Sequence, residues 1–88
     1  MSNAKFEVEK FTGKSNFALW KLKGRDLLVQ QALHKALDGK TKKPANMKDS
    51  DWEDLDARTL SIVRLCLADE VLFNIVEEST ASSLWEKL

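Results

Sequence analysis

The sequence predicts an all-α domain, a small bundle of four to five short helices with an extended N-terminal arm. Apolar residues recur at the three- and four-residue spacing of helix faces over most of the chain. Residues that cap helices precede these runs, whereas the alternation typical of a strand is limited to residues 5–11. At 88 residues the chain has the size of one small domain. We expect residues 1–14 to form the arm and residues 15–88 to form the helical domain.

The arm carries apolar side chains that have no obvious partner. Phe6 and Val8 alternate with Glu7 and Glu9, so an extended backbone places the two kinds on opposite sides. The chain offers no evident second strand for pairing. We therefore expect the arm, which ends near Phe11, either to pack over the helices or to add to a partner.

The first helix is expected to run from Ser15 to Gln31. Gly13 permits a tight turn before it, and Ser15 or Asn16 can accept a hydrogen bond from the free amides of the first turn. Residues 33–37 either continue this helix or form a separate short turn.

Two apolar stripes run along the first helix. The principal face holds Phe17, Trp20, Leu27 and Leu28, together with Gly24, which lets another backbone or an aromatic ring come close. The second stripe consists of Ala18, Leu22, Val29 and Leu33. In so short a chain this stripe must be buried against the arm, another helix or another molecule. We expect the arm to cover it, within one subunit or by exchange of the arm between two.

Residues 40–46 are polar and basic, and they contain the only proline, so they are expected to form a loop. Lys40, Lys42 and Lys43 make this the most basic segment of the chain. The segment is either a solvated connector or a contact for RNA or for an acidic neighbour.

The second helix is expected from Ser50 to about Leu67. Ser50 and Glu53 have the spacing of a capping box, and Asp54 and Arg58 can pair one turn apart on the outside. Its buried face is expected to consist of Trp52, Leu55, Leu60, Ile62, Val63, Cys66 and Leu67.

Two shorter helices complete the predicted bundle. The third opens at Asp69 and Glu70, with Phe73 pointing away from its buried stripe of Val71, Leu72, Ile75 and Val76. The fourth follows Thr80 as its cap and buries Ala81, Leu84, Trp85 and Leu88. Because it runs only two turns before residue 88, the sequence suggests a fragment of a longer protein.

Charge is divided unevenly along the chain although the formal net charge is zero. Residues 1–48 contain eleven Lys or Arg and four acids, a balance of +7, whereas residues 49–88 contain three basic residues and ten acids, a balance of −7. Either the two halves neutralise each other within one molecule, or they attract each other head to tail between copies.

The chain offers little for catalysis. It has one histidine and one cysteine, Cys66, which lies in an apolar run where cysteine usually acts as a small buried hydrophobe. No phosphate-binding loop, nucleophile elbow or metal-ligand spacing occurs. We therefore expect no enzyme activity and no cofactor. The lack of a spanning segment or signal peptide leads us to expect an intracellular protein without membrane contact.

Several signatures together resemble a known family. The first is Phe-x-Gly-x-x-Asn-Phe-x-x-Trp over residues 11–20, which is followed by residues 26–38, by Met47-Lys48 through Trp52-x-x-Leu55-Asp56, and by Thr80-Ala81-x-x-x-Trp85-x-x-Leu88. In this order they resemble the Gag N-terminal region, the capsid N-lobe, of Ty1/copia-type LTR retrotransposons. The resemblance implies a capsid domain that self-assembles into cytoplasmic virus-like particles, in a mobile element or a domesticated gene.

The resemblance also implies partners. The chain should bind itself as a homo-oligomer, while RNA binding would be weak or indirect, through regions that lie further along such proteins. The alternative function is a Gag-derived adaptor that binds a peptide in a groove beside the arm and the first helix. The candidate interaction residues are Phe6, Val8, Phe11, Leu22, Val29 and Phe73, and the weak candidates for RNA or an acidic partner are Lys40, Lys42 and Lys43.

Overall fold

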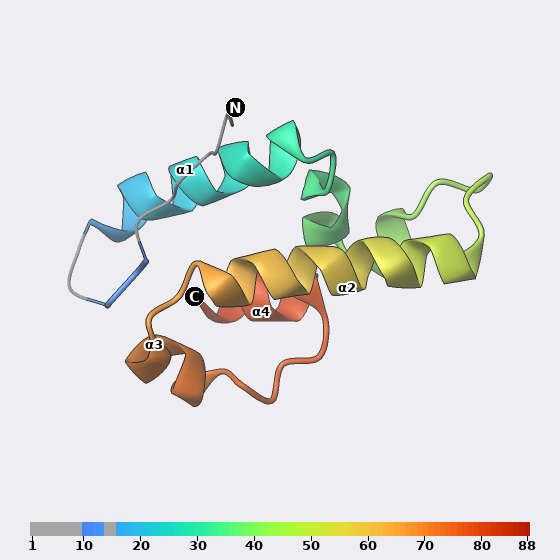
Figure 1. Ribbon diagram of the computed structural model, residues 1–88. Coiled ribbons are helices and arrows are strands. Elements are labelled where there is room, and N and C mark those ends of the chain that lie inside the picture. Colours follow the sequence, from blue (N-terminus) through green and yellow to red (C-terminus); the bar gives the residue numbers. More distant parts are fainter. Residues whose placement is uncertain (1–9, 14–15) are drawn as a thin grey trace, which may run out of the picture.

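A computed structural model describes residues 10–13 and 16–88, and Figure 1 shows the arrangement of its helices. In chain order these are α1 (Phe17–Gln30), η1 (His34–Asp38), η2 (Lys40–Lys42), α2 (Asp49–Leu65), α3 (Asp69–Asn74) and α4 (Ala81–Lys87), where η denotes a 3-10 helix. Within the described residues the only β-type pairing is an isolated bridge between Phe11 and Leu67. The predicted all-α class is confirmed.

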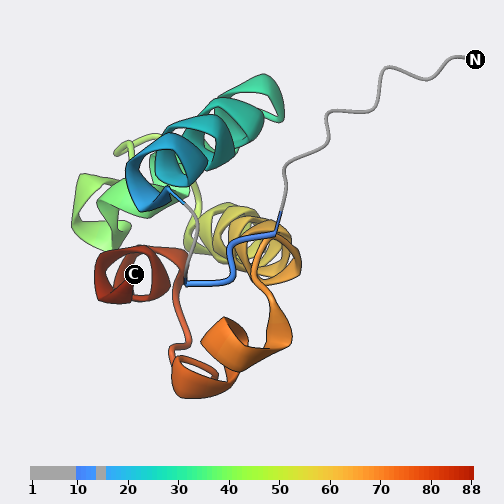
Figure 2. The same ribbon diagram turned by 90° about the vertical axis from the view of Figure 1, so that its left-hand side faces the viewer.

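Three helices surround the core. Viewed nearly end on, α1, α2 and α4 occupy the corners of a triangle, and α3 lies beyond α2 and α4 on the side away from α1 (Figure 2). The buried cluster between them combines residues of α1, η1, α2 and α4 with residues of the segments beside these helices. It consists of Phe11, Trp20, Leu28, Leu33, Ala36, Leu60, Val63, Cys66, Leu67, Ala81 and Leu84.

Helix α1 begins and ends with defined caps. The Asn16 side chain accepts a hydrogen bond from the Leu19 amide at 3.0 Å, so one of the two predicted cap residues is confirmed. At the other end, the Leu33 amide donates to the Leu28 carbonyl at 2.8 Å and the Ala32 amide to the Val29 carbonyl at 3.0 Å. These two bonds form a Schellman motif.

The Schellman motif turns the chain into η1. Ala32 adopts the left-handed conformation, with a φ of 59°, which stops α1 and redirects the chain. Of the two possibilities for residues 33–37, the separate short turn is therefore the one observed. Leu33 therefore lies outside the first helix, on whose second stripe the sequence placed it, and is buried in the core.

The start of α2 differs from the prediction. The helix begins at Asp49 after Lys48 as its cap residue, and no side chain caps it, so the predicted capping box at Ser50 and Glu53 is wrong. Both residues lie inside the helix instead. Lys43 gives a physical reason, because its ammonium group donates to the Met47 carbonyl and pairs with Asp49 at 3.5 Å. This lysine fixes the chain just before the helix.

The C-terminal helices agree more closely with the prediction. The Thr80 hydroxyl accepts a hydrogen bond from the Ser83 amide at 3.2 Å, which confirms the predicted cap of α4. Asp56 on α2 accepts a second bond from the Ala81 amide at 3.0 Å and so ties α4 to α2. On α3 the predicted buried stripe is wrong at Val76, which is 55% exposed, because the helix ends at Asn74.

Candidate interaction surfaces

The aromatic signatures from the two ends of the chain meet in space. The Trp20 and Trp85 ring centroids are 5.8 Å apart, and Phe11 lies 5.2 Å from Trp20 and 5.1 Å from Phe17. A Cβ atom added at Gly24 would lie 3.6 Å from the Trp85 ring, so an aromatic ring approaches this glycine as the sequence predicted. The signatures build the core and hold α1 against α4.

Phe11 belongs to this core and not to an exposed surface. Its side chain is buried, its amide donates to the Cys66 carbonyl at 3.0 Å, and its carbonyl accepts from the Ala68 amide at 3.0 Å. The described end of the arm is therefore an extended segment held at the end of α2. Phe6 and Val8 lie outside the described residues.

The outer face of α1 remains open. Leu19, Leu22 and Val29 are 48%, 58% and 39% exposed. The expectation that Phe11 covers Leu22 and Val29 is wrong, because Phe11 packs on the opposite, buried side of the helix with Phe17 and Trp20. The reason is geometric: the backbone bonds to Cys66 and Ala68 place Phe11 between α1 and α2.

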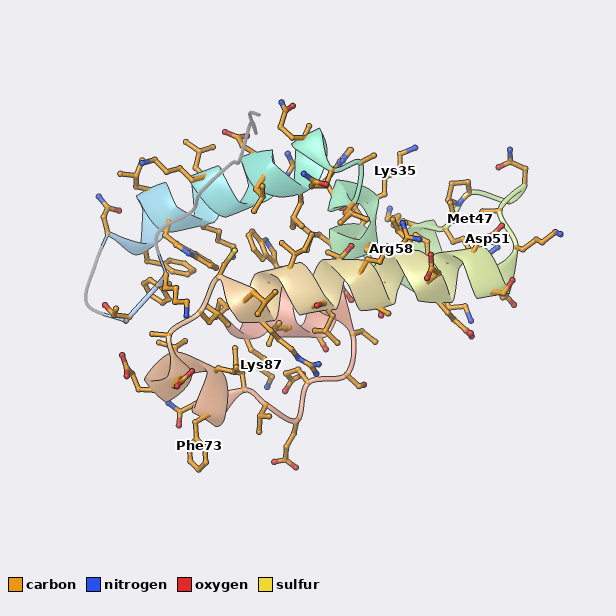
Figure 3. All side chains as sticks on the ribbon, viewed as in Figure 1. Lys35, Met47, Asp51, Arg58, Phe73 and Lys87 are labelled. Carbon is orange, nitrogen blue, oxygen red and sulfur yellow. The ribbon has the colours of Figure 1, made fainter. Side chains whose placement is uncertain are left out.

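A second group of exposed apolar side chains lies on α3 and just after it. Phe73 is 79% exposed and projects away from the bundle in Figure 3, and Val76 is also exposed. Sequence reasoning identified Phe73, Leu22 and Val29 as candidates but missed Leu19, Val76 and Leu65, of which Leu65 on α2 is 71% exposed. Leu65 could have been found, because it falls opposite the buried face of its helix.

In the described part of the chain most ionic groups form no ion pair. Among the described residues, the Lys43–Asp49 pair is the only ion pair that joins the basic and acidic parts of the chain. The other, between Asp54 and Arg58 at 3.1 Å, is the predicted helical pair on the outside of α2. Over residues 10–13 and 16–88 the two parts are therefore not joined by a network of direct ion pairs.

The basic candidates differ from one another. Lys40 and Lys42 are exposed on η2, but Lys43 is half-buried and serves the start of α2. Lys21 also contacts the core aromatics, because its ammonium group lies 5.3 Å from the Phe17 ring centroid and 5.2 Å from that of Trp85, within the range of cation–π attraction. A contact of Lys40 and Lys42 with RNA stays a prediction.

The described residues contain no group of three or more His, Cys, Asp or Glu side chains able to hold a metal ion. Cys66 is a free thiol, and burial raises its pKa above the ordinary value. No helix in the described part of the chain is long and apolar enough to cross a membrane.

Two hollows lie along α2. One, of about 470 Å³, is lined by Gln31, Leu33, Ala57, Arg58, Ser61 and Ile62. The other, of about 400 Å³, lies between Lys40, Trp52 and the start of α4. In the second hollow the Asp56 carboxylate accepts from the Ala81 amide and the Thr80 hydroxyl accepts from the Ser83 amide, so both groups serve the start of α4. The apolar faces on α1 and α3 are therefore the stronger candidates for function.

Comparison with known proteins gives one informative match. No family model and no solved structure matches the chain. Over all 88 residues it is 51% identical to a protein of Nicotiana tabacum named retrovirus-related Pol polyprotein from transposon TNT 1-94. The chain spans 7% of the length of that relative. The predicted resemblance to the Gag N-terminal region is thus confirmed, and the chain is related over its whole length to a segment of a copia-type retrotransposon polyprotein.

Proposed function

We propose that this domain is a self-association module, the capsid N-terminal lobe of a copia-type Gag protein or of a domesticated gene derived from one. Its role is to make the contacts between copies that build a virus-like particle in the cytoplasm. The identity with a copia-type polyprotein supports the Gag origin. The observation that carries self-association is that a closed core leaves large apolar side chains exposed on α1 and α3.

Exposed apolar side chains indicate an interaction surface when several of them lie together. Single ones are normal on protein surfaces, whereas contiguous apolar patches mark interaction sites. Leu19 and Leu22 lie one turn apart on α1, and Val29 lies two turns beyond Leu22 on the same exposed side. Phe73 exposes more of its surface than any other large apolar residue in the described part of the chain. Covering these side chains with a second copy would remove them from water.

Sedimentation equilibrium tests the proposal. The 88-residue chain and a version extended beyond Leu88 would be measured from about 20 μM to about 1 mM, a range suited to a weak association. We expect the average mass to rise with concentration and to rise further in the extended version, which adds the second part of a capsid. A monomer at every concentration in both proteins would refute the proposal.

A second function, a peptide-binding adaptor, is favoured by the position of Phe11. Its segment is extended and bonds to the backbone at Cys66 and Ala68, so the end of α2 offers a place for a strand-like peptide. In this structure the chain's own segment occupies that place. A foreign peptide must therefore displace it.

Deletion of residues 1–12 separates the two functions. An adaptor lacking this segment should bind an added peptide with the sequence of residues 5–12, detectable by a change in tryptophan fluorescence because the Phe11 ring lies 5.2 Å from that of Trp20. A scrambled peptide of the same composition is the control. If the truncated domain folds and ignores both peptides, the adaptor function is refuted while self-association stands.

A further inference from the structure

The outer face of α1 combines apolar and basic side chains. Its apolar members are Leu19, Leu22 and Val29, and its exposed charged members are Lys23, Arg25 and Asp26. None of these three charged residues forms an ion pair with another described residue. We call this set the α1 face, and its net charge is positive.

The outer surface of α3 and of the turn that follows it combines apolar and acidic side chains. Phe73 and Val76 are exposed, and so are Asp69, Glu70 and Glu77. On a helix, Asp69 and Glu70 lie one turn before Phe73 and share its side. Residues 69–77 contain no lysine or arginine. We call this set the α3 face, and it is purely acidic.

The two faces lie on opposite sides of the molecule. Both views show α1 on one side and α3 on the other, with α2 and α4 between them (Figures 1 and 2). The α1 face points away from the bundle, because Trp20, Gly24 and Leu28 on the other side of the helix are buried. Phe73 likewise projects away from the bundle (Figure 3). No single copy can bring its own two faces together.

We propose that the α1 face of one copy binds the α3 face of the next, so that copies associate head to tail. This contact buries Leu22 against Phe73 while setting Lys23 and Arg25 near Asp69, Glu70 and Glu77 of the neighbour. It rests on the proposed self-association and names the surfaces that carry it. A heterologous contact of this kind leaves one face free at each end, so it continues until a ring closes or a filament grows.

Charge argues against pairing of two α3 faces. Two α3 faces brought together would place six carboxylates in one interface without a basic residue from either segment, which is unfavourable. Opposite faces attract instead, and the contact uses the uneven charge of the chain. It also uses both groups of exposed apolar side chains at once.

Complementation between two variants tests the contact. Leu22→Glu disables only the α1 face, and Phe73→Ser disables only the α3 face. Both side chains are largely exposed, so neither change should disturb the core. Leu65→Ser is the matched control, because it removes an equally exposed apolar side chain from α2, outside both faces. Circular dichroism and thermal melting verify that each variant is folded.

Sedimentation then separates the outcomes. We expect the unaltered chain and the control to associate, and each of the other two variants to remain monomeric alone. Mixed in equal amounts, those two should form dimers and nothing larger, since one intact contact remains. In addition, ¹⁵N spectra of labelled Leu22→Glu should shift only around α3 when unlabelled Phe73→Ser is added.

Three results would overturn the assignment. If the unaltered chain stays monomeric, both the proposed self-association and the head-to-tail contact are refuted. If the chain associates and both variants associate equally well, only the choice of faces fails. If Phe73→Ser associates alone whereas Leu22→Glu does not, two α1 faces pair with each other and the head-to-tail contact is wrong.

Discussion

Replacing Ala32 with glycine should stabilise the domain. Ala32 is exposed and holds a φ of 59° in the Schellman motif that ends α1. The left-handed conformation costs an alanine roughly 1–2 kcal/mol, whereas glycine adopts it without that cost. Against this gain, glycine loses about 0.5–1 kcal/mol more backbone entropy on folding. The net expectation is a stabilisation of about 0.5–1 kcal/mol.

Urea denaturation measures the difference directly, and thermal melting should show a rise of about 2–8 °C for a domain of this size. Gln31→Gly is the matched control, since Gln31 has an ordinary φ of −91° and bears no left-handed strain. That substitution should destabilise the domain by about 0.5–1 kcal/mol. If Ala32→Gly destabilises the domain as much as the control does, the Schellman motif and the left-handed residue are wrongly placed.

Three further substitutions test the core. Trp20→Ala should cost about 3–5 kcal/mol in the free energy of unfolding, because the buried ring packs against Phe11, Phe17 and Trp85 and its removal leaves a cavity; a urea midpoint close to that of the parent would contradict this. Thr59→Val should cost about 1 kcal/mol, because the fully buried hydroxyl lies 3.1 Å from the Leu33 carbonyl and 2.8 Å from that of Leu55. No loss of stability would show that these bonds contribute nothing. Gly24→Ala should be neutral or stabilising by up to about 1 kcal/mol, since its Cβ would meet the Trp85 ring at an ordinary 3.6 Å; a large loss in thermal melting would mean that the ring lies closer.

Local sequence signals predicted much of the helical structure. Asn16 and Thr80 cap helices as expected, because a short polar side chain just before a helix can accept a hydrogen bond from a free amide of the first turn. The spacing of Trp20, Leu28 and Leu84 correctly identified buried faces, because each helix has only one side that can face so small a core.

Other features depended on contacts that no local pattern carries. The helix α2 begins at Asp49 because Lys43 reaches across the preceding turn, which overrides the capping box suggested by Ser50 and Glu53. Ala32 gave no sign of a left-handed residue, so the sequence did not show that Leu33 leaves the second stripe of α1 and joins the core. For the candidate faces, the second apolar stripe of the sequence contained Leu22 and Val29, which the core of one copy leaves exposed on α1.

Sedimentation equilibrium of the unaltered chain at two salt concentrations tests the central claim most directly. Raising the salt from about 50 mM to about 500 mM shortens the screening length from more than about 10 Å to a few ångströms. We predict an average mass that exceeds the monomer's 10.0 kDa increasingly with concentration at low salt and falls back towards it at high salt. A mass of 10.0 kDa under all conditions would contradict self-association, and association that strengthens with salt would contradict the charged head-to-tail contact.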